Sequence, residues 1–392
     1  MRWLETKLRM SPLRLLFVVD HAFGISGPHR NVVGSLNALN RLKDIQMTLL
    51  VGRVDPNEPY MKEKKFKLVL GFEPAKPIKF FYNLLLLFKH AIGVDLIYVP
   101  AGLKSALLAA LVAKILRKKI VVGPNVTNLP IRNTDTPGWM EKNILFDLWL
   151  EASASRRNHV INTLGEGYKE FVKTIYHAID GAKFSPDKKN PELWARLGLS
   201  KDSVKILHVG RDNEPRKGVS QLIDAIELIN NTGQRQKIDF IIVGNIREVN
   251  RTRCNSYSNV HFLGFKSGDE LAEIIASSDV SMIPSSWENM PFTVLEGVSS
   301  GVAVLASFTP KGGIPEIIDH LKSGFLTHIV GENGLHKKNA GEIMAKDILY
   351  LVDHPEVRSQ LGAGARARAL EKFSENRLGQ DLQKTFLEVL KS

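Results

Sequence analysis

The segment at residues 283–317, IPSSWENMPFTVLEGVSSGVAVLASFTPKGGIPEI, contains both a strand-helix alternation and a pair of carboxylates. Glu288 and Glu296 stand eight positions apart in it. The apolar run between them predicts a helix that ends near Gly301, and residues 302–306 are typical of a buried parallel strand. We therefore expect Glu288 at the C-terminal end of a strand and Glu296 about two turns into the next helix. Open α/β sheets bind ligands at that end of their strands, so we expect a polar ligand here.

The same alternation extends along most of the chain. In the first half we expect strands at residues 13–20, 47–51, 96–99, 119–122 and 159–162, with helices at 30–41, 80–91, 103–116, 139–152 and 166–176. A second series has strands at 205–209, 238–243, 260–263, 280–284 and 302–306, and it ends in helices over 340–392 with a break near Ser374. Alternation of this kind predicts βαβ units with parallel sheets.

The predicted fold class is α/β, with two doubly wound Rossmann-like domains facing a cleft. A stretch rich in Pro, Lys and Asp interrupts the alternation. We therefore place a first domain at residues 1–180, a linker at 181–203, a second domain at 204–372 and a C-terminal helix at 373–392. The C-terminal helices are expected to pack back toward the first domain.

Composition narrows the class of protein. The chain is 44% hydrophobic and 24% charged, as soluble globular proteins are. A single cysteine, Cys254, excludes an internal disulfide framework and indicates a reducing compartment. No apolar signal-peptide core is present at the N-terminus, and the longest apolar run, residues 80–88, is shorter than the roughly 20 residues that span a bilayer. We expect a cytoplasmic protein.

The net charge of +12 favours anionic partners. The basic residues are scattered and form no nucleic-acid-binding module, so we expect phosphate ligands or membrane lipid and no nucleic acid. The apolar stretches at residues 80–87 and 139–150, beside lysines, leave peripheral contact with an anionic membrane open. Packing on a core explains the same stretches.

Cationic residues follow the first expected strand of the second domain. Gly210 and Arg211 come directly after it, and Lys217 precedes the next helix. An Arg fork, a Lys point charge and a helix N-terminus at one strand end suit a diphosphate. Exposed loop cations explain Arg211 and Lys217 equally well when they are taken alone.

The two carboxylates suggest recognition of hydroxyl groups, because an ionised carboxylate accepts hydrogen bonds from two adjacent hydroxyls. A nucleotide sugar offers two such diols. A helix-surface carboxylate explains Glu296 if it is considered singly. No cluster of His or Cys accompanies Glu288, so no metal is expected. Glycines at Gly24 and Gly27 suit close approach of a ligand to a helix N-terminus, although a tight turn explains them as well.

Together these segments resemble retaining glycosyltransferases of the GT-B fold, glycosyltransferase family 4 (group 1). The matching pieces are GRDNEPRKG at residues 210–218, the pair Glu288 and Glu296 with its surroundings, KGGIPEIIDHLKSGFL at 311–326, AIDGAKFSP at 178–186 and, more weakly, FGISGPHRNVVGSL at 23–36. The resemblance covers nearly all of the second domain.

The resemblance implies a role for each matching residue. Arg211 and Lys217 would bind the donor diphosphate and stabilise the leaving group, and Glu288 would hold the donor sugar. The remaining donor-binding positions would be Gly27, Gly210, Asn289, Met290, Pro291, Phe292 and Glu296, with Glu296 on the ribose. No cofactor is implied, because the nucleotide sugar is a substrate and such enzymes generally need no metal.

The expected reaction is retaining transfer of a hexose from a UDP- or GDP-sugar to a glycan, a lipid-linked or a small-molecule acceptor held by the first domain. One departure from the family is Gly123-Pro124-Asn125, which stands where many members have a histidine. Two alternatives therefore stay open: a GT-B sugar phosphorylase or epimerase, and a non-catalytic subunit that binds nucleotide sugars.

Overall fold

The computed structural model describes residues 11–22, 27–125, 146–232 and 238–392. The chain divides into two compact units. The first comprises Met1–Ala178 and Glu375–Ser392, and the second comprises Ile179–Ser374. The residues expected to form a linker, 181–203, thus belong to the second unit. The last helix belongs to the first.

Among the described residues of the first unit, seven parallel strands form one sheet in the order β3-β2-β1-β4-β5-β6-β7. Seven of the ten residues of the central strand β1 are buried, because both faces of the sheet are covered. The strands are β1 (Leu13–Ala22), β2 (Ile45–Val54), β3 (Lys67–Leu70), β4 (Leu96–Ala101), β5 (Lys119–Asn125), β6 (Leu148–Glu151) and β7 (Val172–Thr174).

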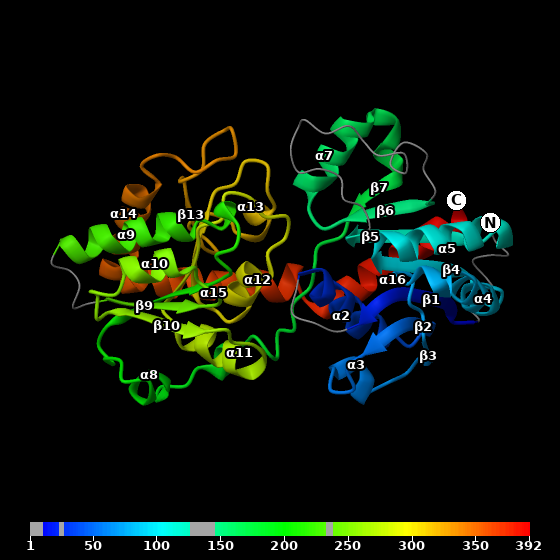
Figure 1. Ribbon diagram of the computed structural model, residues 1–392, viewed down its shortest axis with the longest axis horizontal. Helices are drawn as coiled ribbons and strands as arrows, with labels where there is room; N and C mark the ends of the chain where they lie inside the picture. Colours follow the sequence, from blue (N-terminus) through cyan, green and yellow to red (C-terminus); the bar gives the residue numbers. More distant parts are fainter. Residues whose placement is uncertain (1–10, 23–26, 126–145, 233–237) are drawn as a thin grey trace. The chain divides into compact units, whose positions relative to one another are not determined.

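Helices cover both faces of this sheet (Figure 1). Residues of α2 and α16 share one core cluster with the sheet, and residues of α4 and α5 share the other. The helices are α2 (Gly27–Asn40), α3 (Pro59–Lys62), α4 (Phe80–Ala91), α5 (Leu103–Leu116), α7 (Ala154–Leu164) and α16 (Glu375–Lys391), with 3-10 turns η1 (Pro77–Lys79) and η2 (Glu166–Phe171).

The C-terminal helix α16 completes the first unit. It packs against α2 and buries Leu378, Leu382 and Phe386. The ring of Phe386 lies 5.1 Å from that of Tyr98 on β4. Of the C-terminal helices that were expected to pack back toward the first domain, the last one does so, whereas residues 340–372 belong to the second unit.

Three predicted elements of the first unit were wrong. The helix expected at residues 139–152 contains strand β6, and its part at residues 139–145 lies outside the described residues. The strand expected at 159–162 is part of α7, which starts because Ser153 Oγ accepts a hydrogen bond from the Arg156 amide. The helix expected at 166–176 is a 3-10 turn followed by β7. In β6, burial of all four residues between β5 and β7 outweighs local helix preference.

In the described part of the second unit, six parallel strands form a sheet in the order β10-β9-β8-β11-β12-β13. The predicted strands are present, and only the three-residue β13 was not predicted. They are β8 (Val204–Val209), β9 (Ile238–Val243), β10 (Val260–Gly264), β11 (Val280–Ile283), β12 (Ala303–Ser307) and β13 (Phe325–Thr327).

Helices α9 and α14 pack together on one face of the second sheet, and α12 and α15 pack together on the other (Figure 1). The helices are α8 (Leu193–Arg196), α9 (Val219–Asn231), α10 (Glu248–Arg253), α11 (Gly268–Ser277), α12 (Phe292–Ser299), α13 (Ile314–Ile317), α14 (Ala340–Asp353) and α15 (Pro355–Lys372), with 3-10 turns η3 (Pro186–Lys188) and η4 (Pro215–Lys217).

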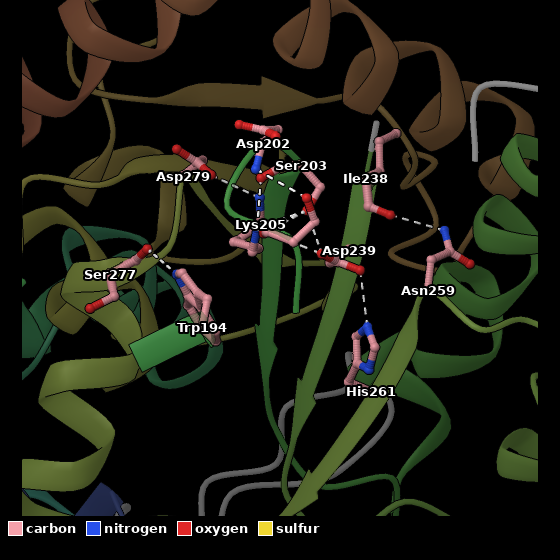
Figure 2. A network of polar contacts seen from close by, with 11 residues as sticks. Trp194, Asp202, Ser203, Lys205, Ile238, Asp239, Asn259, His261, Ser277 and Asp279 are labelled. Atoms are coloured by element: carbon pink, nitrogen blue, oxygen red, sulfur yellow. Dashed lines mark hydrogen bonds and ion pairs between the residues drawn. The ribbon is translucent and has the colours of Figure 1, made fainter. Parts of the chain in front are cut away.

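A polar network closes the N-terminal end of the second sheet (Figure 2). The ammonium group of buried Lys205 donates to the carbonyl and hydroxyl oxygens of Ser203, each at 2.7 Å, and lies 3.6 Å from Asp239. His261 Nε2 lies 3.0 Å from the same Asp239 carboxylate. Trp194 Nε1 donates to the Ser277 carbonyl at 2.8 Å, which ties the segment before β8 to α11. Lys205 and His261 thus both contact Asp239 at this end of the sheet, and we assign these three residues a structural role.

Strand order reverses in each sheet at one pair of neighbours. In the second unit the chain runs outward from β8 through β9 to β10, and then from β11 through β12 to β13. The chain therefore leaves β8 and β11 toward opposite sides of the sheet, and the C-terminal ends of such a strand pair are where doubly wound folds bind ligands. The corresponding pair in the first unit is β1 and β4.

Candidate functional site

The loop after β8 approaches the loop after β11 very closely. It runs through Gly210 and Arg211 into η4 and then to Gly218, whose φ is +72°. A Cβ atom on Gly218 would lie 2.1 Å from the carbonyl oxygen of Pro284, the first residue after β11. The Ser286 amide donates to the Arg216 carbonyl at 2.7 Å. Only glycine allows this backbone conformation and this approach.

Two cations from the first loop meet the carboxylate of Glu288 from the second. Lys217 Nζ donates to Glu288 Oε1 at 2.6 Å, and Arg216 Nη1 lies 3.3 Å from the same oxygen. The side chains of Lys217 and Glu288 are 22% and 13% exposed. The group is shielded enough for charge to matter, yet a ligand can still reach it.

Arg216 also fixes the shape of the second loop. Its Nη1 donates to the Trp287 carbonyl at 3.0 Å, and its Nε donates to Glu214 at 2.6 Å. Sequence reasoning missed Arg216. The only signal for it was its position beside Lys217 in the run PRK.

The loop after β12 supports Glu288 from the other side. The Gly313 amide donates to the Glu288 carbonyl at 2.8 Å, and Trp287 Nε1 donates to the Lys311 carbonyl at 2.9 Å. A Cβ atom on Gly312 would lie 2.8 Å from the Glu288 carbonyl oxygen. The amides of Gly312 and Gly313 both donate within the protein, and these glycines allow close packing.

A buried histidine lies beneath Gly210. His208 Nδ1 lies 3.0 Å from the Met282 carbonyl oxygen on β11, and its Nε2 would be 2.7 Å from a Cβ atom on Gly210. Burial lowers the pKa of His208, and the charge of Lys217 acts in the same direction. The ring is therefore a neutral floor to the site, and Gly210 has to be glycine to lie above it.

The remaining predicted donor-binding residues lie on the same loops. Arg211 is exposed, directly after Gly210. Met290 and Pro291 are buried, and Asn289 and Phe292 are partly exposed. Because Pro291 has no N–H group, it contributes no amide donor at the start of α12.

Glu296 lies in the second turn of α12, and its side chain is 0% exposed. It is therefore not a helix-surface carboxylate, which was the competing explanation. Burial of a carboxylate is costly unless it is paired, so this position carries a specific interaction.

In the first unit, Gly27 is the exposed first residue of α2, and a Cβ atom there would meet nothing within 4 Å. Gly24 lies outside the described residues. At the β1–β4 pair, Ser105 Oγ donates to Asp20, and burial raises the pKa of that carboxyl. Where the family histidine was expected, a Cβ atom on Gly123 would lie 2.4 Å from the Pro100 carbonyl oxygen, so that position cannot hold a side chain.

Across residues 11–22, 27–125, 146–232 and 238–392, three or more His, Cys, Asp or Glu side chains never gather as a metal-binding group. In those same ranges, helices long and apolar enough to cross a bilayer are absent.

Comparisons with known proteins show what the chain is similar to. Residues 203–343 match the family model of group 1 glycosyl transferases. The chain is 23% identical to N-acetyl-alpha-D-glucosaminyl L-malate synthase of Bacillus anthracis. That alignment spans 310 residues and covers 76% of each chain. It is 26% identical to N,N'-diacetylbacillosaminyl-diphospho-undecaprenol alpha-1,3-N-acetylgalactosaminyltransferase of Campylobacter jejuni. That alignment spans 236 residues and covers 59% of this chain and 55% of the relative.

The fold is similar to that of a solved structure as well. The crystal structure of Anabaena HepE in complex with UDP and glucose aligns with a TM-score of 0.70 and 19% identity, over 96% of this chain and 100% of that one.

Proposed function

Because this chain is a group 1 glycosyltransferase with the two-domain GT-B fold, we propose that it transfers a hexose from a UDP- or GDP-sugar with retention of configuration. The observation that carries the proposal is the contact of Lys217 and Arg216 with Glu288 at the β8–β11 pair. Lys217 and Arg216 are cations, which suit a diphosphate, and Glu288 is a carboxylate, which suits sugar hydroxyls. Both cations lie within 3.3 Å of the same Glu288 oxygen.

In this proposal Lys217 and Arg211 bind the donor diphosphate, and Glu288 accepts hydrogen bonds from the sugar. Lys217 is held near the diphosphate position by Glu288 before the donor arrives. The amides of Asn289, Met290 and Phe292 and the close approach at Gly210 add donor contacts. Glu296 holds the ribose hydroxyls.

The reaction breaks the bond between the anomeric carbon and the diphosphate oxygen, whose electron pair leaves with the diphosphate. The acceptor oxygen bonds to the anomeric carbon on the same face, and its proton passes to the departing phosphate oxygen. Negative charge therefore grows beside Lys217 and Arg211. Fixed cations at that place lower the barrier, with a typical contribution of about 3 kcal/mol for one such group.

The donor and acceptor classes draw on relatives. HepE was solved with UDP and glucose, and the Campylobacter relative is named for a diphospho-undecaprenol acceptor. We therefore favour a glycan or lipid-linked acceptor bound by the first unit. A lipid-linked acceptor is held in a bilayer, so the enzyme would have to reach it at the membrane surface. Peripheral contact with an anionic membrane is therefore part of the same proposal.

Labelled UDP- and GDP-sugars, incubated with the purified chain and lipid-linked or small-molecule acceptors, test the proposal. Transfer that yields an axial or equatorial linkage matching the donor anomer supports retaining transfer. Sugar phosphate released only with inorganic phosphate would indicate a phosphorylase, and conversion of the donor sugar alone would indicate an epimerase. Donor binding without turnover in any of these reactions would indicate a non-catalytic subunit.

A further inference from the structure

Helix α4 of the first unit is apolar on both of its faces. Leu87 and Ala91, spaced by four residues, are buried in the core under the sheet. On the opposite face Phe81 and Leu85 are 78% and 68% exposed. A helix on the surface of a globular protein is normally polar on the face away from the core, so this outer face departs from that pattern.

The exposed apolar surface continues beyond α4. Helix α5 packs beside α4 (Figure 1), and it exposes Leu111 and Ile115. We define the α4–α5 face by its exposed apolar side chains, which are Ile78, Phe81, Leu85, Ile92, Leu111 and Ile115. Exposed apolar side chains gathered on two neighbouring helices mark a contact with a partner or a membrane.

Positive charge accompanies this face. Residues 73–118 contain seven Lys or Arg and two acidic residues, Glu73 and Asp95, which leaves a formal charge of +5. Arg14, near the start of β1, engages Asp95 at 2.6 Å. Glu73 pairs with Lys76 and Lys79. Lys89 and Lys114 are exposed on α4 and α5 themselves. The face is thus apolar and cationic at once.

We propose that the α4–α5 face binds the surface of an anionic lipid bilayer. Aromatic and aliphatic side chains on one helix face enter the interfacial region, and flanking lysines keep their charges at the headgroups. A second copy of the chain fits less well. A two-fold interface would place the same cationic face on both sides, and like charges would oppose it.

Membrane binding by this face does not need the sugar donor, although it would bring the first unit to a lipid-linked acceptor. Flotation with vesicles tests it, using mixed phosphatidylglycerol and phosphatidylcholine, and phosphatidylcholine alone. The chain is expected to float with the anionic vesicles and to dissociate from them at high salt. Two double variants are tested separately, Phe81→Ser/Leu85→Ser and Lys89→Glu/Lys114→Glu. Each is expected to bind the anionic vesicles with an affinity at least about tenfold lower than that of the unchanged chain.

Matched controls lie in the second unit. Val249→Ser and Leu335→Ser change apolar side chains of similar exposure, and Lys346→Glu reverses an exposed lysine; each should bind vesicles as the unchanged chain does. Absence of flotation by the unchanged chain would overturn the proposal, and so would undiminished flotation of both α4–α5 variants. A dimer in solution that Phe81→Ser/Leu85→Ser dissociates would also overturn it, in favour of a second copy. Binding of nucleotide sugars, measured by thermal shift without vesicles, reports separately on the donor site.

Discussion

Lys217 Nζ lies 2.6 Å from Glu288 Oε1 although the two residues are 71 positions apart in the chain. The contact forms because β8 and β11 are neighbours in the sheet, so that the loops leaving their C-terminal ends meet. Arg216 joins from the same turn as Lys217. The order of the strands thus brings the site together. Its charged side chains lie at the C-terminal ends of two central strands, where a ligand can reach them.

Replacing Lys217 or Arg211 by Ala is expected to lower kcat about a hundredfold, since each variant removes a cation that stabilises the departing diphosphate. Melting temperature should change little, because both side chains have access to solvent. Steady-state rates and thermal melts, with Lys346→Ala on α14 as the control, check this. Parallel losses of activity and melting temperature would count against a phosphate role.

Arg216 is expected to act as a positioning residue for Glu288 and the Trp287 carbonyl. Arg216→Lys keeps the charge but cannot reach Glu214, Glu288 and the carbonyl together, because the guanidinium fork is lost. We expect KM for the donor to rise about tenfold or more in Arg216→Lys, with kcat changed less. A variant with the donor KM of the unchanged chain would remove Arg216 from the site.

Gly218→Ala is expected to destabilise the second unit. The left-handed backbone alone costs about 1–2 kcal/mol in a non-glycine residue, and the collision with Pro284 adds to that. Gly93→Ala is the matched control, because a Cβ atom there meets nothing within 4 Å. Urea unfolding should separate the two variants. Equal stability would mean that the two loops are not held as closely as described.

Much of the fold could be predicted from local pattern, while the site could be predicted only in part. Apolar runs such as β9 and α4 stand out in the sequence by themselves, so their bounds were predicted correctly. Strand β6 and helix α7 were not, because pairing with β5 and the cap at Ser153 decide them. Lys217 and Glu288 were each predicted, but Arg216 gains its role only from the fold.

Stability should depend on pH through Glu151. Burial raises the pKa of this carboxyl to about 8, from an ordinary value of 4.5, and Arg156 opposes the shift only in part. As pH rises between those values the unfolded chain releases the proton while the folded chain keeps it. The free energy of unfolding therefore falls by about 1.4 kcal/mol per pH unit from this group. Stability from this group is present at low pH and lost as pH approaches about 8.

The variant Glu151→Gln is neutral at every pH and should lack this slope. Its free energy of unfolding relative to the unchanged chain should rise by about 3 kcal/mol between about pH 5.5 and about pH 7.5. Urea titrations at the two pH values measure the difference. Parallel curves for the two proteins would show that Glu151 is ionised in the folded state.

Calorimetric titration of UDP, UMP, GDP, GMP and UDP- and GDP-sugars into the unchanged chain, Lys217→Ala and Glu288→Gln tests the central claim most directly. We predict that one nucleoside diphosphate binds at least about tenfold more tightly than its monophosphate, and that Lys217→Ala removes this preference. Glu288→Gln should weaken the nucleotide sugar more than the free diphosphate. Binding that ignores the second phosphate, or that survives both substitutions unchanged, would contradict a donor site between β8 and β11.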